Sequence, residues 1–151
     1  MKRAVLLLLV LIGLLATPAA LASDKSLENA LKPYKAKLTT DIAYLATFKA
    51  PTKSKASAAS KELAKIESTL KGAKSAAESH QASSSKGKTG RKDVIAGVTD
   101  ALTATADGKS SASAAKSGKS SKAKSDAKAE LNAIDKALPL LETGGKDLGL
   151  F

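Results

Sequence analysis

The stretch ASAASKELAKIESTLKGAKSAAESH, residues 56–80, decides how this chain folds. Small and apolar residues return at every third or fourth position, a rhythm typical of a helix face that packs against a partner in a coiled coil or bundle. Lysine and glutamate occupy seven of the seventeen positions between them and belong in water. Because such a narrow face needs other helices to cover it, the stretch predicts an all-α protein. The stripe consists of Ala56, Ala59, Leu63, Ile66, Leu70, Ala73, Ala77 and His80.

Apolar residues at the same spacing predict further helices along the chain. Pro33 kinks the first helix, because proline removes a backbone hydrogen bond and clashes with the preceding turn. A loop with two glycines over 85–90 reverses the chain after the second helix, and Gly118 suits a left-handed C-cap after the third. Gly144 and Gly145 stop the fourth helix and leave 144–151 as a flexible C-terminal tail. The expected helices cover residues 24–49, 53–85, 91–117 and 121–142.

Three to four long helices with short turns predict an antiparallel up-down bundle over residues 23–143. The large apolar side chains gather toward one end of this bundle, since residues 103–130 contain none. A buried leucine contributes roughly 1.5–3 kcal/mol and an alanine much less. We therefore expect amide hydrogens to exchange more slowly over 63–70 than over 112–127.

The first 22 residues have the pattern of a secretion signal. Lys2 and Arg3 precede a leucine-rich apolar run over 4–16, and small residues stand before a cleavage point between Ala22 and Ser23. The pattern predicts a cleaved signal peptide and a secreted or extracytoplasmic protein, in a periplasm or at a cell surface. The alternative is a retained membrane anchor, but the apolar run is shorter than the ~20 residues that a membrane span needs.

The mature chain has a thin core and a large positive charge. Without its signal it keeps 23 basic residues against 14 acidic ones, and only 21 of its 129 residues are leucine, isoleucine, valine or phenylalanine. This composition is typical of intrinsic disorder, so the alternative is a largely disordered cationic secreted protein that folds on a partner or on nucleic acid. The periodicity favours the bundle, because low-complexity sequence would not keep one phase over seven turns. The absence of cysteine excludes disulfides and thiol catalysis.

No motif in the chain predicts catalysis, a cofactor or a metal. Residues 82–89 fit a relaxed phosphate-loop pattern, but a helix precedes them where that motif needs a strand, so we interpret them as an interhelical turn. His80 is the single histidine, and without cysteine it has no partner for a zinc or haem site. No serine stands in the sharp, glycine-flanked turn that exposes a nucleophilic serine in a catalytic triad. The sequence therefore predicts a protein that is not an enzyme.

The strongest functional signal is a lysine-rich segment over 108–128. Its composition is similar to the Ala/Lys/Ser-rich tails of linker histones and bacterial histone-like proteins, and this resemblance implies electrostatic, salt-sensitive binding of nucleic acid. The export signal and the lack of an aromatic stacking platform argue against specific nucleic-acid binding. We instead expect an interaction or structural role at the cell envelope, with an anionic polymer, a membrane surface or a helical protein as partner. The alternative is that the charge only keeps a small bundle soluble. The tentative anion-binding residues are Lys109, Lys116, Lys119, Lys122, Lys124 and Lys128.

Overall fold

The structure, a computed structural model, describes residues 23–150. The expected signal peptide over 1–22, its cleavage point and the last residue lie outside this range. Within it every regular element is helical and there is no strand, so the predicted all-α class is confirmed. Residues 23–31 are helical, and the following elements are the 3-10 turn η1 (Lys32–Tyr34) and the helices α2 (Lys35–Ala46), α3 (Ala56–Ser79), α4 (Ser85–Lys116) and α5 (Ser120–Asp147).

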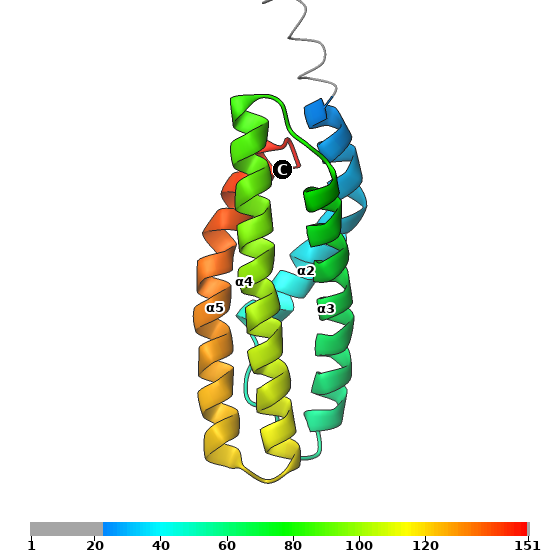
Figure 1. The fold of residues 1–151 in the computed structure, drawn as a ribbon. Helices are drawn as coiled ribbons and strands as arrows, with labels where there is room; N and C mark the ends of the chain where they lie inside the picture. The colour runs from blue at the N-terminus through cyan, green and yellow to red at the C-terminus, as the bar shows by residue number, and fades with distance from the viewer. Residues whose placement is uncertain (1–22, 151) are drawn as a thin grey trace, which may run out of the picture.

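The three longest helices lie side by side, with α4 between α3 and α5 and with α2 crossing behind them (Figure 1). The most extensive contacts join α4 to α5, followed by those that join α3 to α4. The shorter α2 touches the other helices at far fewer points. The core therefore lies between the long helices, and α2 covers only part of it.

The buried face of α3 is the predicted stripe. Six of its eight positions are buried, and Leu63 and Leu70 are completely shielded from solvent. These residues belong to a main apolar cluster that includes Leu27, Leu45 and Val98. A second, smaller cluster contains only alanines and lies where the start of α3 meets the turn between α4 and α5. Its members are Ala56, Ala114, Ala115 and Ala123.

Glycines allow α4 and α5 to approach closely. A Cβ atom added at Gly144 would lie 2.8 Å from the carbonyl oxygen of Gly90, and one added at Gly97 would lie 2.7 Å from Cγ of Leu141. Glycine is unfavourable inside a helix, by about 1 kcal/mol relative to alanine. Here it leaves room for the neighbouring helix, which explains why both helices contain it.

The loop predicted over 85–90 is wrong, because these residues form the start of α4. The side chain of Ser84 caps this helix by accepting a hydrogen bond of 2.8 Å from the backbone N–H of Gly87. The chain instead reverses over residues 80–84, so the expected helices 53–85 and 91–117 become Ala56–Ser79 and Ser85–Lys116. The glycines of this segment serve packing, since a Cβ at Gly87 would collide with the Asp24 carboxylate.

The predicted end at 142 and the flexible tail over 144–151 are also wrong for most of their length. Helix α5 passes through Pro139 and continues to Asp147, with Gly144 buried against α4. Close packing therefore overrides the helix-stopping tendency of glycine, and Leu148 beyond the helix is buried as well. The expected start at 121 differs by one residue. Gly118 adopts a left-handed conformation, with φ of 74°, as its C-cap position predicted.

The first predicted helix, 24–49, is interrupted at the position of its proline. Pro33 lies in the 3-10 turn η1, after which α2 runs only to Ala46. Beyond α2, Phe48 is buried although it stands outside the helix. The chain then extends toward Pro51, because the residue before a proline disfavours helical backbone angles.

Candidate functional site

Five of the six predicted lysines lie around the turn between α4 and α5. This turn closes the end of the molecule that is coloured yellow in Figure 1. Lys116, Lys119, Lys124 and Lys128 are exposed, and none of them forms an ion pair with another described residue. Their ammonium groups therefore face solvent at one end of the protein.

Lys109, the sixth predicted lysine, lies farther along α4 and joins it to α3. Its Nζ is 2.6 Å from a carboxylate oxygen of Glu67, which also pairs with Lys71 at 2.7 Å. A hydrogen bond from Lys109 and a weaker effect of the hydrogen bond from Lys71 lower the pKa of Glu67 to about 2. The side chain of Lys109 is thus engaged in a contact between helices and contributes less to the exposed charge.

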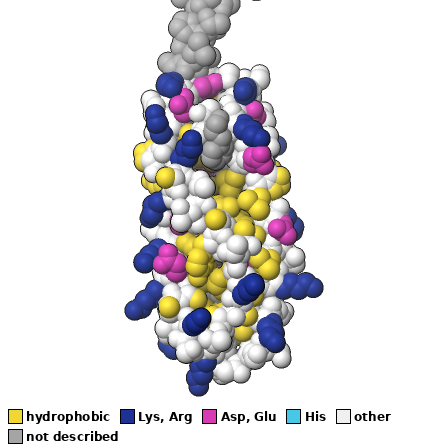
Figure 2. Space-filling view, turned by 180° about the vertical axis from the view of Figure 1, so that it is seen from behind, with side chains coloured by type: hydrophobic (Ala, Val, Ile, Leu, Met, Phe, Trp, Pro, Cys, Tyr) yellow, Lys and Arg dark blue, Asp and Glu magenta, His cyan; other side chains and the backbone are white. Residues whose placement is uncertain are grey.

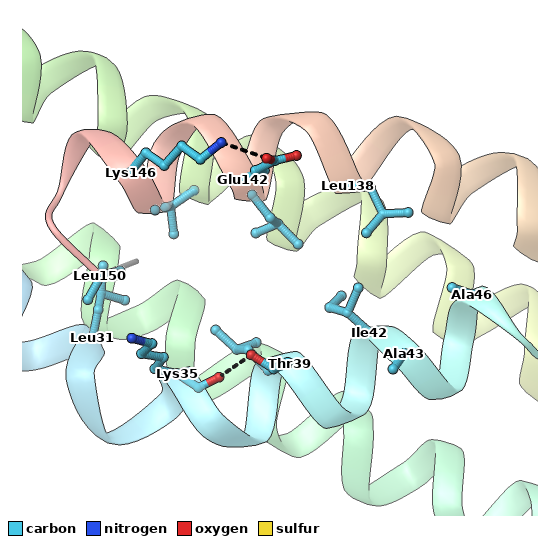
Figure 3. A pocket seen from close by; sticks show the side chains of 14 residues that line it. Leu31, Lys35, Thr39, Ile42, Ala43, Ala46, Leu138, Glu142, Lys146 and Leu150 are labelled. Carbon is cyan, nitrogen blue, oxygen red and sulfur yellow. Dashed lines mark hydrogen bonds and ion pairs between the residues drawn. The ribbon is translucent and has the colours of Figure 1, made fainter.

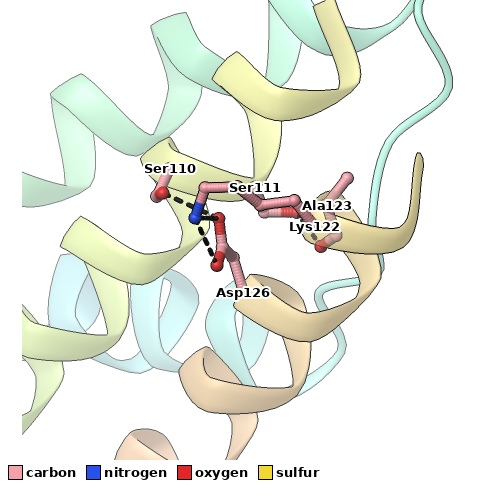
Figure 4. A network of polar contacts seen from close by, with 5 residues as sticks. All are labelled: Ser110, Ser111, Lys122, Ala123 and Asp126. Atoms are coloured by element: carbon pink, nitrogen blue, oxygen red, sulfur yellow. Dashed lines mark hydrogen bonds and ion pairs between the residues drawn. The ribbon is translucent and has the colours of Figure 1, made fainter. Parts of the chain in front are cut away.

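Asp126 neutralises one lysine of this end and helps to hold α4 against α5 (Figure 4). It pairs with Lys122 at 2.9 Å and accepts a hydrogen bond of 2.7 Å from the hydroxyl of Ser110. The bond from Lys122, followed by that from Ser110, lowers the pKa of the Asp126 carboxyl. Beside this group, the buried hydroxyl of Ser111 donates to the carbonyl of Ala123 at 2.7 Å. These bonds fix the two helices that carry the exposed lysines.

Two further lysines, outside the lysine-rich segment 108–128, lie at the same end of the folded protein. Lys53 and Lys55 are exposed and immediately precede α3, and Ala56 next to them packs in the alanine cluster beside the α4–α5 turn. Asp126 is the only acidic residue in the segments 47–61 and 110–129. Figure 2 accordingly shows lysines and no acidic side chains around the lower end of the face it displays. We call this region the lysine-rich end and define it as Lys53, Lys55, Lys116, Lys119, Lys122, Lys124 and Lys128.

The second feature is an apolar groove of about 470 Å³ between α2 and α5. Leu38 and Ile42 of α2 form one wall, Leu138 and Leu141 of α5 form the other, and Val94 of α4 contributes as well. Leu138 is 40% exposed, and it is the one large hydrophobic residue so exposed within residues 23–150. Apolar side chains accordingly form a band on the face shown in Figure 2. We call this feature the apolar groove.

The polar groups of the apolar groove lie at its rim. Lys146 pairs with Glu142 across 2.6 Å on α5, and Lys35 stands on the α2 side (Figure 3). Both lysines lie toward the end of the groove that Leu150 closes, whereas Leu138 lies toward the other end. The groove therefore has its charged side chains, Lys35, Lys146 and Glu142, at one end and is apolar at the other.

A third feature is a carboxyl group inside the core. Glu130 of α5 is completely buried, and neither of its carboxyl oxygens has a hydrogen-bond partner among the described residues. Burial raises the pKa of Glu130 to about 8, with smaller contributions from Asp107 and Asp135. The side chain therefore carries a proton at neutral pH.

The residues that matched a phosphate-loop pattern hold one of the protein's own carboxylates. The backbone N–H of Ser83 donates to Asp24 at 2.9 Å, and both the N–H and the hydroxyl of Ser84 also donate to it. The hydroxyl of Ser84, together with these backbone bonds, holds the pKa of Asp24 below its usual range. His80, at the start of the same loop, contacts the carbonyl of Ala76 through Nδ1 at 2.9 Å.

Among residues 23–150, no three histidine, cysteine, aspartate or glutamate side chains gather as a metal site requires. In the same range, no helix combines the length and the apolar character that crossing a membrane requires. Comparison of the chain with protein-family models, curated proteins and solved structures finds no match. The functional argument therefore starts from the lysine-rich end and the apolar groove themselves.

Proposed function

We propose that this protein is an exported, non-catalytic helical protein that binds anionic surfaces of the cell envelope through its lysine-rich end. The observation that carries the proposal is the separation of charge along the molecule. Seven lysines from two segments of the chain, 47–61 and 110–129, meet at one end, with Asp126 as the only acidic residue in those segments. Elsewhere on the molecule, Glu28, Glu78 and Glu142 each lie within 4.0 Å of a lysine.

Lysine suits an extended anionic surface better than a shaped ligand. Its ammonium group is a compact charge on a flexible stem and does not impose the planar, two-pronged geometry of arginine. Several such groups on one end attract phosphate-bearing polymers or lipid headgroups over a distance set by ionic strength. The expected binding is therefore additive, broad in specificity and sensitive to salt.

The sequence pattern and the helix arrangement support the rest of the proposal. The pattern of residues 1–22 supports export with cleavage between Ala22 and Ser23, and hence a location outside the cytoplasm. The short connections between α3, α4 and α5, which lie side by side, support an antiparallel up-down bundle in solution. In this arrangement the bundle is a rigid scaffold that presents the lysines.

The test compares retention on heparin and on anionic liposomes at rising salt for two variants of equal net charge. The first variant neutralises the lysine-rich end. The second neutralises four exposed lysines on other parts of the helices, none of which forms an ion pair with a described residue. The substitutions are Lys116→Gln, Lys119→Gln, Lys124→Gln and Lys128→Gln in the first, and Lys61→Gln, Lys88→Gln, Lys92→Gln and Lys136→Gln in the second.

We expect the first variant to elute at clearly lower salt than the second, because only the first removes charges that act together at one place. Equal shifts for both variants would show that net charge alone sets retention, as in a protein whose lysines only confer solubility. Circular dichroism of the unbound protein in dilute buffer tests the scaffold. A helical signal that appears only with a polyanion would favour the alternative, a disordered chain that folds on its partner.

A further inference from the structure

The apolar groove lies apart from the lysine-rich end, and its chemistry indicates a different ligand. Apart from the rim residues Lys35, Thr39, Glu142 and Lys146, the side chains that line it are apolar. Ligand sites in proteins typically occupy about 300–1,000 Å³ and combine an apolar lining with a few polar groups that fix orientation. With a volume of about 470 Å³, the groove falls within this range.

The size of the groove favours a small molecule over a protein partner. Fourteen residues line it, whereas a stable protein–protein interface uses about 20–30 residues on each side. An apolar cavity of about 150 Å³ holds one benzene molecule, so about 470 Å³ has room for a chain of about 18 carbon atoms. This capacity corresponds to one acyl chain and not to the two chains of a phospholipid.

The charges at the rim define the head group and its direction. Lys35 and Lys146 stand toward the end that Leu150 closes, and Leu138 stands toward the opposite end (Figure 3). Lys146 already donates to Glu142 at 2.6 Å. An ammonium group has three donors, so Lys35 and Lys146 can each serve a further carboxylate in addition to their contacts within the protein. A chain with an anionic head would place the head between these lysines and its tail against Leu138.

We propose that the apolar groove binds a free long-chain fatty acid, with the carboxylate at Lys35 and Lys146 and the chain extended toward Leu138. The binding buries Leu138, which otherwise remains exposed to water. No bond is made or broken, and the site is distinct from the surface that would contact the envelope.

The first test is isothermal titration calorimetry of the purified protein with saturated fatty acids from octanoate to hexadecanoate, below the concentrations at which they aggregate. Affinity should rise about fourfold per CH₂ group, the factor that corresponds to about 0.8 kcal/mol for each methylene buried. Equal affinity across the series would overturn the proposal. Binding of phosphatidylglycerol vesicles without any binding of the free acids would also overturn it, because the ligand would then be a membrane.

The second test fills the groove. Ala43→Trp and Ala46→Trp each place an indole ring in the groove from the exposed side of α2, and Ala129→Trp places the same ring on α5 outside it. We expect the first two variants to lose at least tenfold in affinity for hexadecanoate and the third to bind normally, with circular dichroism confirming that all are helical. Normal binding by both groove variants would overturn the proposal.

The third test concerns the head group and separates the two proposed sites. Lys35→Gln combined with Lys146→Gln should weaken hexadecanoate binding about fivefold, as expected for exposed charge pairs, and leave hexadecanol binding unchanged. An equal loss for acid and alcohol would contradict the proposed orientation. The variant that neutralises four lysines of the lysine-rich end should bind hexadecanoate normally, so failure of one site does not imply failure of the other.

Discussion

Replacement of Glu130 by glutamine should stabilise the protein at neutral and alkaline pH and remove most of the loss of stability that occurs as pH rises above about 4. The side chain is completely buried, and no described residue bonds to its carboxyl oxygens. Ionisation at this position leaves an unpaired charge in the core, where its cost is high. Glutamine has nearly the same shape and cannot ionise, so it isolates the effect of the charge.

The charged groups that act on Glu130 oppose its ionisation. Asp107 on α4 and Asp135 on α5 both raise its pKa through their own negative charge. From α2, Tyr44 lies within electrostatic range of Glu130 and also of Glu62 on α3, and its own pKa is raised, mainly by burial. Among residues 23–150, the charged groups that shift the pKa of this carboxyl are therefore both acidic.

The size of the effect follows from the pKa, which burial raises from 4.5 to about 8. Between these values the folded protein keeps a proton that the unfolded chain has lost, so the free energy of unfolding falls as pH rises. One pKa unit corresponds to 1.36 kcal/mol, which gives a loss of about 3 kcal/mol at pH 7 relative to pH 4. This is a large fraction of the 5–15 kcal/mol that typically stabilises a domain, roughly the range we expect here.

Urea denaturation followed by circular dichroism, at intervals from about pH 4 to about pH 8, measures this dependence. The stability difference between Glu130→Gln and the wild type should grow in favour of the variant by about 3–4 kcal/mol across that range. Glu142→Gln is the matched control on the exposed face of the same helix, where Lys146 lowers the pKa of the carboxyl. Parallel stability curves for Glu130→Gln and the wild type would refute the assignment of a buried, neutral glutamic acid.

Three further predictions concern the contacts between helices. Gly144→Ala should lower the free energy of unfolding, measured with urea, because the new Cβ would lie 2.8 Å from a backbone oxygen and this clash should cost more than the ~1 kcal/mol that alanine gains in a helix. Greater stability of the variant would contradict the close approach of α4 and α5. Asp24→Ala should destabilise the protein by about 1–3 kcal/mol and speed amide exchange over 80–84, because Ser83 and Ser84 lose their acceptor; unchanged exchange would argue against this contact. Because the pKa of Glu67 is lowered to about 2, the stability of the protein should fall as pH decreases from about 4.5 toward 2. Glu67→Gln should make the melting temperature depend less on pH in this range, and an unchanged dependence would contradict the prediction.

The sequence predicted the class of fold and the buried face of α3 because periodicity records which side of a helix avoids water. Leu63, Ile66 and Leu70 are buried as their spacing requires. Helix ends were predicted less well, because glycine was interpreted as a helix breaker. Gly87 and Gly144 lie inside helices, where they make room for Asp24 and for α4. A local preference of about 1 kcal/mol is easily overridden by such packing, which the sequence does not display.

The candidate sites, like the helices, could be predicted only in part from the sequence. The lysines of 108–128 stand out as a local excess of charge, but Lys53 and Lys55 join them only through the fold. The apolar groove could not be predicted from the sequence, because Leu138 fits the apolar spacing of a helix whether or not another helix packs over it. Glu130 could have been recognised, since it lies three residues after Ala127 and four before Ile134 on the buried stripe of α5.

The alanine cluster at the lysine-rich end determines how that end would respond to denaturant. Ala56, Ala114, Ala115 and Ala123 bury only one methyl group each, so local opening there exposes little apolar surface. Both the heat-capacity increment and the denaturant slope of an opening reaction scale with the surface exposed. Amide exchange at this end should therefore change little with added urea, whereas exchange near Leu63 should accelerate steeply. Local opening of the lysine-rich end should therefore be distinguishable, by its weak dependence on urea, from opening of the leucine-rich core.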